Sequence, residues 1–214
     1  MYKVDLHTHS TDSPDGGITS AQYRHALSTG LLDCIAITDH GSIDFASKLQ
    51  EEVGDKIIVG QEIMTTDGEI IGLYLKEKVP AKLTPVDAIK AIKGQEGLVY
   101  IPHPLETRRH GLQINILDEL SDDIDIIEVG NGRSLLQYRY TQMLVWANLN
   151  HVAIAASSDA HGKVGLGHTY TSVNEIPTKS TLLKLLLSGT PIVKRPTVRA
   201  LLYPKYNRAK GRYS

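Results

Sequence analysis

The 214-residue chain has little of several features that define other classes of protein. Its single cysteine, Cys34, excludes an internal disulfide framework, and the apolar run CIAIT around it predicts a buried, inert thiol. No apolar run approaches the roughly 18 residues that a membrane span needs, and the strand-like start has no basic and apolar signal region. We therefore expect one main domain, located in the cytoplasm, with no membrane partner.

The sequence also lacks an excess of either charge, since 23 Lys and Arg stand against 24 Asp and Glu. Any attraction for nucleic acid must therefore be local. Residues 194–214 contain seven basic residues and no acidic one, which predicts a solvated basic tail over 196–214 behind a domain over 1–195. The tail favours an oligonucleotide partner. One Phe and one Trp disfavour base stacking, although ten tyrosines leave it open.

Short segments rich in Val and Ile alternate along the chain with longer amphipathic segments, a rhythm typical of βα units. Most of the apolar segments have no polar face, which indicates a parallel sheet covered by helices. An Asp67-Gly68 turn predicts a hairpin that returns after the third strand. Strands are expected at 2–6, 34–38, 56–63, 97–102, 124–131, 151–157 and 169–173. Helices are expected at 20–30, 42–53, 84–94 and 178–189.

Histidines and acidic residues follow the carboxyl ends of six of these strands. His7 and His9 are one residue apart and point to the same side, and Asp159 and His161 repeat that spacing. The carboxyl ends of parallel strands meet at one face, so the side chains should converge there. Imidazole and carboxylate ligands suit zinc, manganese or iron, and more than one ion is expected because the candidates outnumber the ligands of a single site. The remaining candidates are Asp39, His40, Glu62, His103, Glu128 and Asn131.

Two sets of residues have a structural interpretation instead. Asp39 could cap the helix that begins near residue 42. A lone histidine is more often structural than a ligand, and the positions of His25, His110 and His151 in a helix, a loop and the wrong end of a strand favour that role.

Six motifs occur in order over residues 1–195: DLHTHS, AITDH, GQEI, PHP, IEVGNGR and SSDAH. This series resembles the PHP family, named for polymerase and histidinol phosphatase. The resemblance implies an α/β fold, a distorted seven-stranded (β/α)7 barrel, with two or three divalent metal ions and phosphoester hydrolysis. The ligands that it implies are His7, His9, Glu62 and Asp159 for a first ion, Glu62 and His103 for a second, and Asp15, His40 and His161 for a third.

The resemblance favours Asp15 over Asp12 because the family motif places its acidic ligand just before a glycine. One departure concerns the second ion. Many relatives have a histidine after the third strand, whereas residues 70–74 here are Ile, Ile, Gly, Leu and Tyr. Glu128 or a water could complete that site.

The expected function is that of a metal-dependent phosphoesterase acting on a phosphate monoester or on the terminus of a short oligonucleotide. We expect Arg133, and less strongly Arg108 or Arg109, to bind phosphate, and His168 to act as a general acid. Two alternatives stay open. One is a metal-dependent hydrolase of amides or phosphotriesters, and the other is an inactive PHP module that binds metal for stability or for a partner. The oligomeric state has no signal in the sequence.

Overall fold

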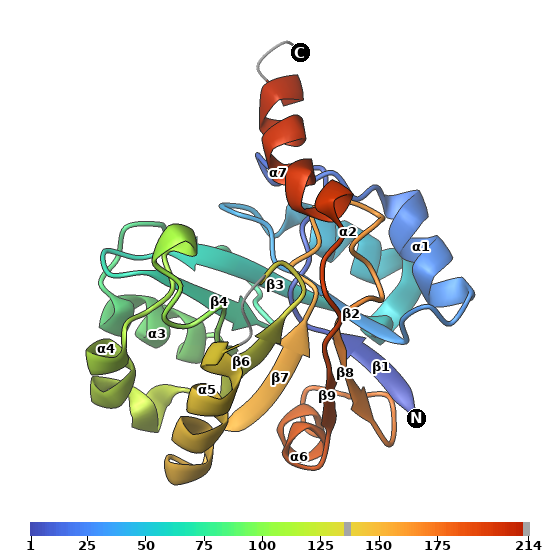
Figure 1. Ribbon diagram of the computed structural model, residues 1–214. Helices are drawn as coiled ribbons and strands as arrows, with labels where there is room; N and C mark the ends of the chain where they lie inside the picture. Colours follow the sequence, from blue (N-terminus) through green and yellow to red (C-terminus); the bar gives the residue numbers. More distant parts are fainter. Residues whose placement is uncertain (135–137, 212–214) are drawn as a thin grey trace.

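The computed structural model describes residues 1–134 and 138–211. They form a mixed α/β fold in which one nine-stranded sheet curves into a nearly closed barrel surrounded by helices (Figure 1). The strands are β1 (Tyr2–Asp5), β2 (Cys34–Ile37), β3 (Ile57–Met64), β4 (Glu69–Leu73), β5 (Leu98–Ile101), β6 (Ile126–Asn131), β7 (Ala153–Ser157), β8 (Tyr170–Val173) and β9 (Thr190–Ile192). The α-helices are α1 (Ser20–Ser28), α2 (Asp44–Val53), α3 (Pro85–Lys93), α4 (Ile114–Glu119), α5 (Tyr138–Leu149), α6 (Leu182–Leu187) and α7 (Val198–Gly211). Short 3₁₀ helices lie at Gly54–Lys56, Thr107–Arg109 and Ser121–Asp123.

Two groups of parallel strands run in the same direction. β1, β2 and β3 form one group, and β5, β6 and β7 form the other. β4 lies between the groups and is antiparallel to both of its neighbours, β3 and β5. The carboxyl ends of the six parallel strands therefore lie at one end of the barrel, together with the amino end of β4.

The barrel closes between β7 and the pair β1 and β8 through a few specific contacts. The Thr171 hydroxyl of β8 accepts a hydrogen bond from the Ala156 amide of β7 at 2.8 Å. Beyond the strands, Thr8 and Ala160 form a parallel bridge. The loop after β1 therefore lies directly beside the loop after β7, although about 150 residues separate them in sequence.

Apolar side chains are buried on both faces of the sheet, which explains the continuous apolar segments of the sequence. Helices α1 to α5 cover the outer face, and their apolar sides pack on one core that includes Tyr23, Leu49 and Ile89. The barrel interior is a second core, and α6 packs against it at the end opposite α7 (Figure 1). Residues of the inner core include Val4, Leu6, Ala36, Ile58, Tyr100, Ala155, Leu182 and Leu186.

Two of the four predicted helix starts have side-chain caps in the structure, whereas α2 begins at Asp44 and α6 at Leu182, later than expected. The Thr84 hydroxyl accepts a hydrogen bond from the Asp87 amide at 3.2 Å, and Pro85 occupies the first turn of α3. Thr19 and Gln22 form a reciprocal capping box at α1. The Asp67-Gly68 hairpin between β3 and β4 is also confirmed.

Three expectations need correction. The sheet has nine strands instead of seven, because the hairpin return is a full strand, β4, and β9 extends the edge beside β8. The residues expected to form a solvated basic tail mostly form helix α7. Asp39 does not cap α2, since its carboxylate accepts hydrogen bonds from the amide and the hydroxyl of Ser10.

No helix within 1–134 or 138–211 is long and apolar enough to cross a membrane.

Candidate metal centre

The eight predicted metal ligands gather at the carboxyl end of the barrel. Seven of them have at most 4% of the side chain exposed, and the eighth, His40, is 27% exposed. They come from five strand ends: His7, His9 and Asp15 after β1, His40 after β2, Glu62 in β3, His103 after β5, and Asp159 and His161 after β7.

Glu62 lies at the middle of this cluster and offers its two carboxylate oxygens to different partners. Oε2 lies 3.2 Å from Nε2 of His7, 3.2 Å from Nε2 of His9 and 3.5 Å from Nε2 of His40. Oε1 lies 2.9 Å from Nε2 of His103. A carboxylate placed in this way can bridge two ions.

Asp159 and Asp15 supply carboxylates on either side of the histidine pair. Oδ1 of Asp159 lies 3.7 Å from Nε2 of both His7 and His9. Oδ2 of Asp15 lies 3.3 Å from Nε2 of His161, and Oδ1 lies 3.8 Å from Nε2 of His40. Asp12, in contrast, is exposed at the turn after β1, and the four donor groups of the cluster include Asp15 and not Asp12.

Two of the ligands have a backbone conformation that residues other than glycine seldom adopt. His103 has φ of 28° and Asp159 has φ of 50°, both in the left-handed region. Such residues cost free energy and persist where the surrounding structure holds them, commonly at functional sites. Here the left-handed turn follows β5 and β7 directly and keeps both side chains within the cluster.

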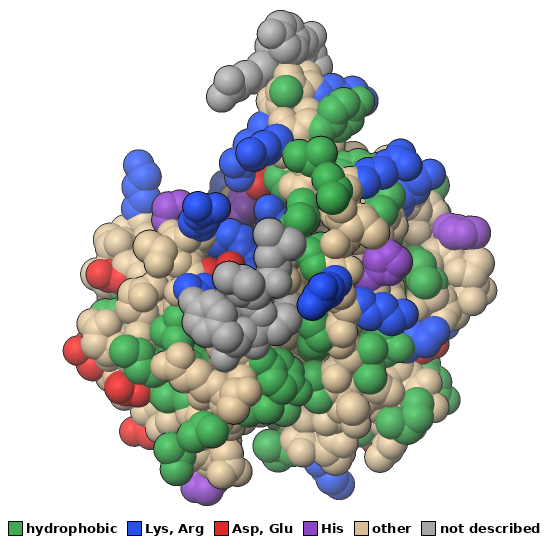
Figure 2. All heavy atoms as spheres, in the orientation of Figure 1, with side chains coloured by type: hydrophobic (Ala, Val, Ile, Leu, Met, Phe, Trp, Pro, Cys, Tyr) green, Lys and Arg blue, Asp and Glu red, His purple; other side chains and the backbone are tan. Residues whose placement is uncertain are grey.

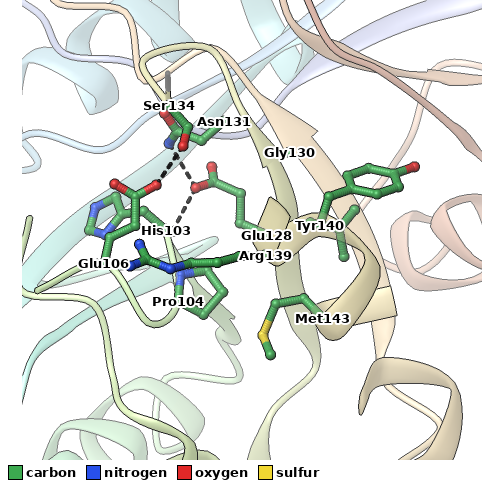
Figure 3. Close-up of a pocket in the computed structure, with 11 residues that line it drawn as sticks. His103, Pro104, Glu106, Glu128, Gly130, Asn131, Ser134, Arg139, Tyr140 and Met143 are labelled. Atoms are coloured by element: carbon green, nitrogen blue, oxygen red, sulfur yellow. Dashed lines mark hydrogen bonds between the residues drawn. The ribbon is translucent and has the colours of Figure 1, made fainter. Parts of the chain in front are cut away.

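Hydrogen bonds behind the cluster orient the imidazole rings. Oε1 of Glu128 lies 3.4 Å from Nδ1 of His7 and accepts a hydrogen bond from the Tyr100 hydroxyl at 2.7 Å. Oε2 of Glu128 accepts from the His103 amide and from the Asn131 side chain (Figure 3). Glu128 therefore lies on the far side of His7, where it fixes the ring with Nε2 turned inward, and it does not fill the gap in the second site.

Glu69, at the start of β4, lies beside His103 on that side of the cluster and was missed by the sequence analysis. Its Oε2 lies 3.6 Å from Nε2 of His103, and its Oε1 lies 4.0 Å from Nδ1 of His40. The predicted hairpin was the feature of the sequence that could have identified it. The first residue of an antiparallel return strand lies beside the carboxyl ends of the two neighbouring strands. Tyr74, at the other end of β4, lies near Asp55 and Glu96 instead.

The electrostatics of the cluster are those of a cation site. Burial alone would raise the pKa of Glu62, but the facing His7 and His40 lower it well below its usual value. Burial also opposes ionisation of Asp159, whereas Arg133 and His7 lower its pKa. Burial and repulsion from Glu62 raise the pKa of Glu69 to about 9. Carboxylates held this close together need positive charge between them.

The donor set fits divalent metal ions. The cluster contains four groups of three donor atoms. Within each group, all three atoms lie within 4.8 Å of one another. An ion bound about 2.1 Å from tetrahedral donors holds them about 3.4 Å apart. The distances from Glu62 and Asp159 to His7 and His9 lie close to that value. The four groups are His7, Glu62 and His103; His7, His9 and Asp159; His9, His40 and Glu62; and His9, Asp15 and His161.

A cleft of about 230 Å³ opens over the cluster, and cationic side chains line it. Arg109 donates to Oδ2 of Asp159 at 2.5 Å, and Arg133 lies 3.3 Å from Oδ1 of the same residue. Figure 2 shows Lys and Arg side chains gathered at the base of α7, with histidine and acidic atoms between them. The arginines expected to bind phosphate, Arg108 included, are therefore at the cleft.

Two histidines outside the cluster had expected roles that can be compared with their position relative to the cleft. His110, interpreted as structural, lines the cleft. His168 is half-buried and is not among the described residues that line it, so its role as a general acid stays a sequence prediction.

No family model matches the chain. Two uncharacterised proteins from Methanocaldococcus jannaschii are similar to it in sequence. One is 37% identical over 143 residues, which cover 61% of this chain and 82% of the relative. The other is 34% identical over 187 residues, which cover 81% of this chain and 71% of the relative.

Solved structures share the fold at lower sequence identity. A two-domain protein from Bacteroides vulgatus containing a predicted PHP-like metal-dependent phosphoesterase has a TM-score of 0.73 at 20% identity, over 97% of this chain and 69% of that one. The lesion-specific endonuclease PfuEndoQ from Pyrococcus furiosus has a TM-score of 0.63 at 17% identity, over 89% and 57%. An amidohydrolase from Chromobacterium violaceum has a TM-score of 0.62 at 16% identity, over 94% and 96%.

The six ordered motifs fall on the strand ends that build the cluster, and the fold around them is that of PHP-like structures. The alignments with the two sequence relatives cover most of the length of each relative. The chain has the fold of PHP-like structures, and its motifs resemble those of the PHP family.

Proposed function

We propose that the protein is a metal-dependent phosphoesterase that hydrolyses a phosphate monoester or the terminus of a short oligonucleotide. The position of Glu62 carries this proposal, because its two oxygens join the His7, His9 and His40 side of the cluster to His103. Such a carboxylate is suited to a site with two or more ions.

The distances within the cluster support one assignment of residues to ions. His7, His9, Glu62 and Asp159 would hold one ion. Glu62 and His103 would hold a second, together with Glu69, which lies 3.6 Å from His103. Asp15, His9 and His161 offer donors for a third. Divalent ions in such a site supply Lewis acidity, which polarises a phosphoryl oxygen and allows water to attack at neutral pH.

The remaining side chains of the cleft bind and orient the substrate. Arg133 and Arg109 present guanidinium groups beside Asp159, and a guanidinium binds a phosphate group through two parallel hydrogen bonds. Arg108 lines the same cleft. These cations would neutralise the phosphate and stabilise the negative charge that the reaction develops.

The experiment is a hydrolysis assay with the protein loaded with Mn²⁺, Zn²⁺ or Fe²⁺. We expect turnover of an aryl phosphate or of a 5′-phosphorylated oligonucleotide, and the ratio of the two rates decides between the two substrate classes. Glu62→Gln should abolish turnover and keep the fold, as judged by circular dichroism. Exposed Glu77→Gln is the matched control and should keep full activity.

Two results would contradict the proposal. Hydrolysis of an amide or a phosphotriester, without hydrolysis of monoesters or oligonucleotides, would favour a hydrolase of another bond, and amide hydrolysis is the chemistry named for the Chromobacterium violaceum neighbour. No hydrolysis of any substrate, together with metal binding that only raises the melting temperature, would favour an inactive metal-binding module.

A further inference from the structure

Helix α7 rises from the end of the barrel that holds the cluster, and only one side of it contacts the barrel (Figure 1). Leu201, Pro204, Lys205 and Arg208 line the cleft. On the other side, Val198, Leu202 and Tyr206 are more than half exposed. The helix is therefore held to the barrel through a narrow band of residues, and two of these form specific polar contacts.

Asn207 joins the two loops that carry the ligands proposed for the third ion. Its side-chain nitrogen donates to the backbone carbonyl oxygens of Asp15 and His161, both at 2.9 Å. The side chains of Asp15 and His161 face each other at 3.3 Å. Gly17 leaves room for this contact, since a Cβ there would lie 2.7 Å from the Asn207 nitrogen. Asn207 thus fixes the spacing of the two backbones from which the ligand pair projects.

Arg208 contacts the same pair through its side chain. Its guanidinium lies 2.6 Å from Oδ2 of Asp15, which is also the oxygen that faces Nε2 of His161. The Arg208 side chain is 62% exposed, whereas that of Asp15 is 4% exposed. The exposed Arg208 side chain also lines the cleft, so its guanidinium can reach a group bound there.

We propose that α7 is part of the active site. Asn207 is a positioning residue that holds Asp15 and His161 at ligand spacing. Arg208 pairs with Asp15 in the metal-free protein and turns to a phosphate oxygen of the substrate when Asp15 binds an ion. The part played by Arg208 rests on the proposed phosphoesterase function, and the part played by Asn207 requires only metal binding.

Titration of the full-length protein with Mn²⁺ by calorimetry tests the positioning role. Asn207→Ala should weaken the binding of one ion about tenfold, as for other residues that orient metal ligands. Asn207→Asp keeps the size of the side chain, cannot donate to the two carbonyl groups when ionised, and should have the same effect. Asn174→Ala is the control at an exposed asparagine. Binding by both Asn207 variants equal to that of wild type would overturn this role.

Arg208→Gln should act in the opposite direction on metal binding. Loss of the competing cation should tighten Mn²⁺ binding about two- to fivefold, since that is the range of an exposed ion pair. The same variant should raise the KM for an aryl phosphate about tenfold with kcat little changed, and Arg208→Lys should restore part of the loss. Exposed Arg199 of the same helix, which is not among the described residues that line the cleft, provides the control Arg199→Gln.

The two parts of the proposal fail separately. Weaker Mn²⁺ binding by Arg208→Gln, or an unchanged KM, would overturn the exchange of partners by Arg208. A wild-type protein that hydrolyses no phosphoester would overturn the proposed function and the substrate contact of Arg208 together. The Mn²⁺ titration of the Asn207 variants would still decide the positioning role.

Discussion

Glu69 is an unusual carboxyl group because the protein surrounds it with other acids. It has at most 8% of its side chain exposed, and burial and Glu62 raise its pKa to about 9. In a metal-free protein this group keeps its proton at neutral pH. Binding of an ion between Glu69 and His103 would favour the ionised form and release that proton.

This shift predicts how stability depends on pH in the metal-free protein. The folded state keeps a proton on Glu69 that the unfolded state loses above about pH 4.3. The free energy of unfolding should therefore fall as pH rises from about 4.3 to about 9. Glu69→Gln should flatten this fall, as measured by urea denaturation with a chelator present. Glu77→Gln, at an exposed site, should leave the slope unchanged, and an equal slope for Glu69→Gln would contradict the prediction.

The backbone at Gly16 lies close to the backbone at Ser10, and the position of Asp15 depends on this close approach. A Cβ at this position would lie 2.0 Å from the carbonyl oxygen of Ser10, so Gly16→Ala must displace the loop that carries Asp15. We expect Mn²⁺ binding about tenfold weaker and a loss of about 1–3 kcal/mol of stability. Calorimetry and thermal melting measure the two effects. Asp12→Ala, in the same loop, should bind Mn²⁺ like the wild type, and a loss there would mean that Asp12 is a ligand.

At the scale of elements, the Thr171 side chain supplies one of the contacts that close the barrel between β7 and β8. The buried Thr171 hydroxyl accepts from the Ala156 amide and donates to the Ala156 carbonyl oxygen. Thr171→Val keeps the shape and leaves both backbone groups unpaired, so we expect a loss of about 1–3 kcal/mol in urea denaturation. Thr190→Val, at an exposed position of β9, should change stability by less than about 0.5 kcal/mol.

The parallel strands could be predicted because each is a short apolar run with its ligand at the carboxyl end. Glu69 does not fit this rule, because it stands at the beginning of a strand. The hairpin was predicted, but β4 is antiparallel to both of its neighbours, so its first residue is the one that lies at the cluster. Strand direction is decided by pairing between distant segments, and the sequence shows it only through the Asp67-Gly68 turn.

Helix α7 could not be predicted for a different reason. It lacks acidic residues, contains Pro204 and has a weak apolar pattern, all of which indicate a tail. Several of its contacts with the barrel are polar: Asn207 donates to two backbone carbonyl groups, and Arg208 pairs with Asp15. Backbone carbonyl groups leave no trace in a sequence pattern, so contacts of this kind appear only in the structure.

At the scale of the whole molecule, metal binding and folding should be linked. The ligands come from five strand ends, so an unfolded chain cannot offer them together. Mn²⁺ at 100 times its dissociation constant should stabilise the protein by about 2.7 kcal/mol, which raises the melting temperature by about 5–10 °C for a domain of this size. A chelator should reverse the shift. Glu62→Gln should lose most of it, and a full shift in that variant would argue against Glu62 as the central ligand.

The long sequence separation across the β1 and β7 seam also sets an order of events during translation. His7 and His9 are made first, and Asp159 and His161 follow about 150 residues later. At about 5–20 residues per second, the first two histidines wait roughly 8–30 s for those partners. During that time the nascent chain carries the His7 and His9 pair and Glu62, which faces both histidines in the folded protein, but it still lacks Asp159 and His161. The cluster therefore cannot be complete until most of the chain has been made, and its first two histidines are exposed before their last partners appear.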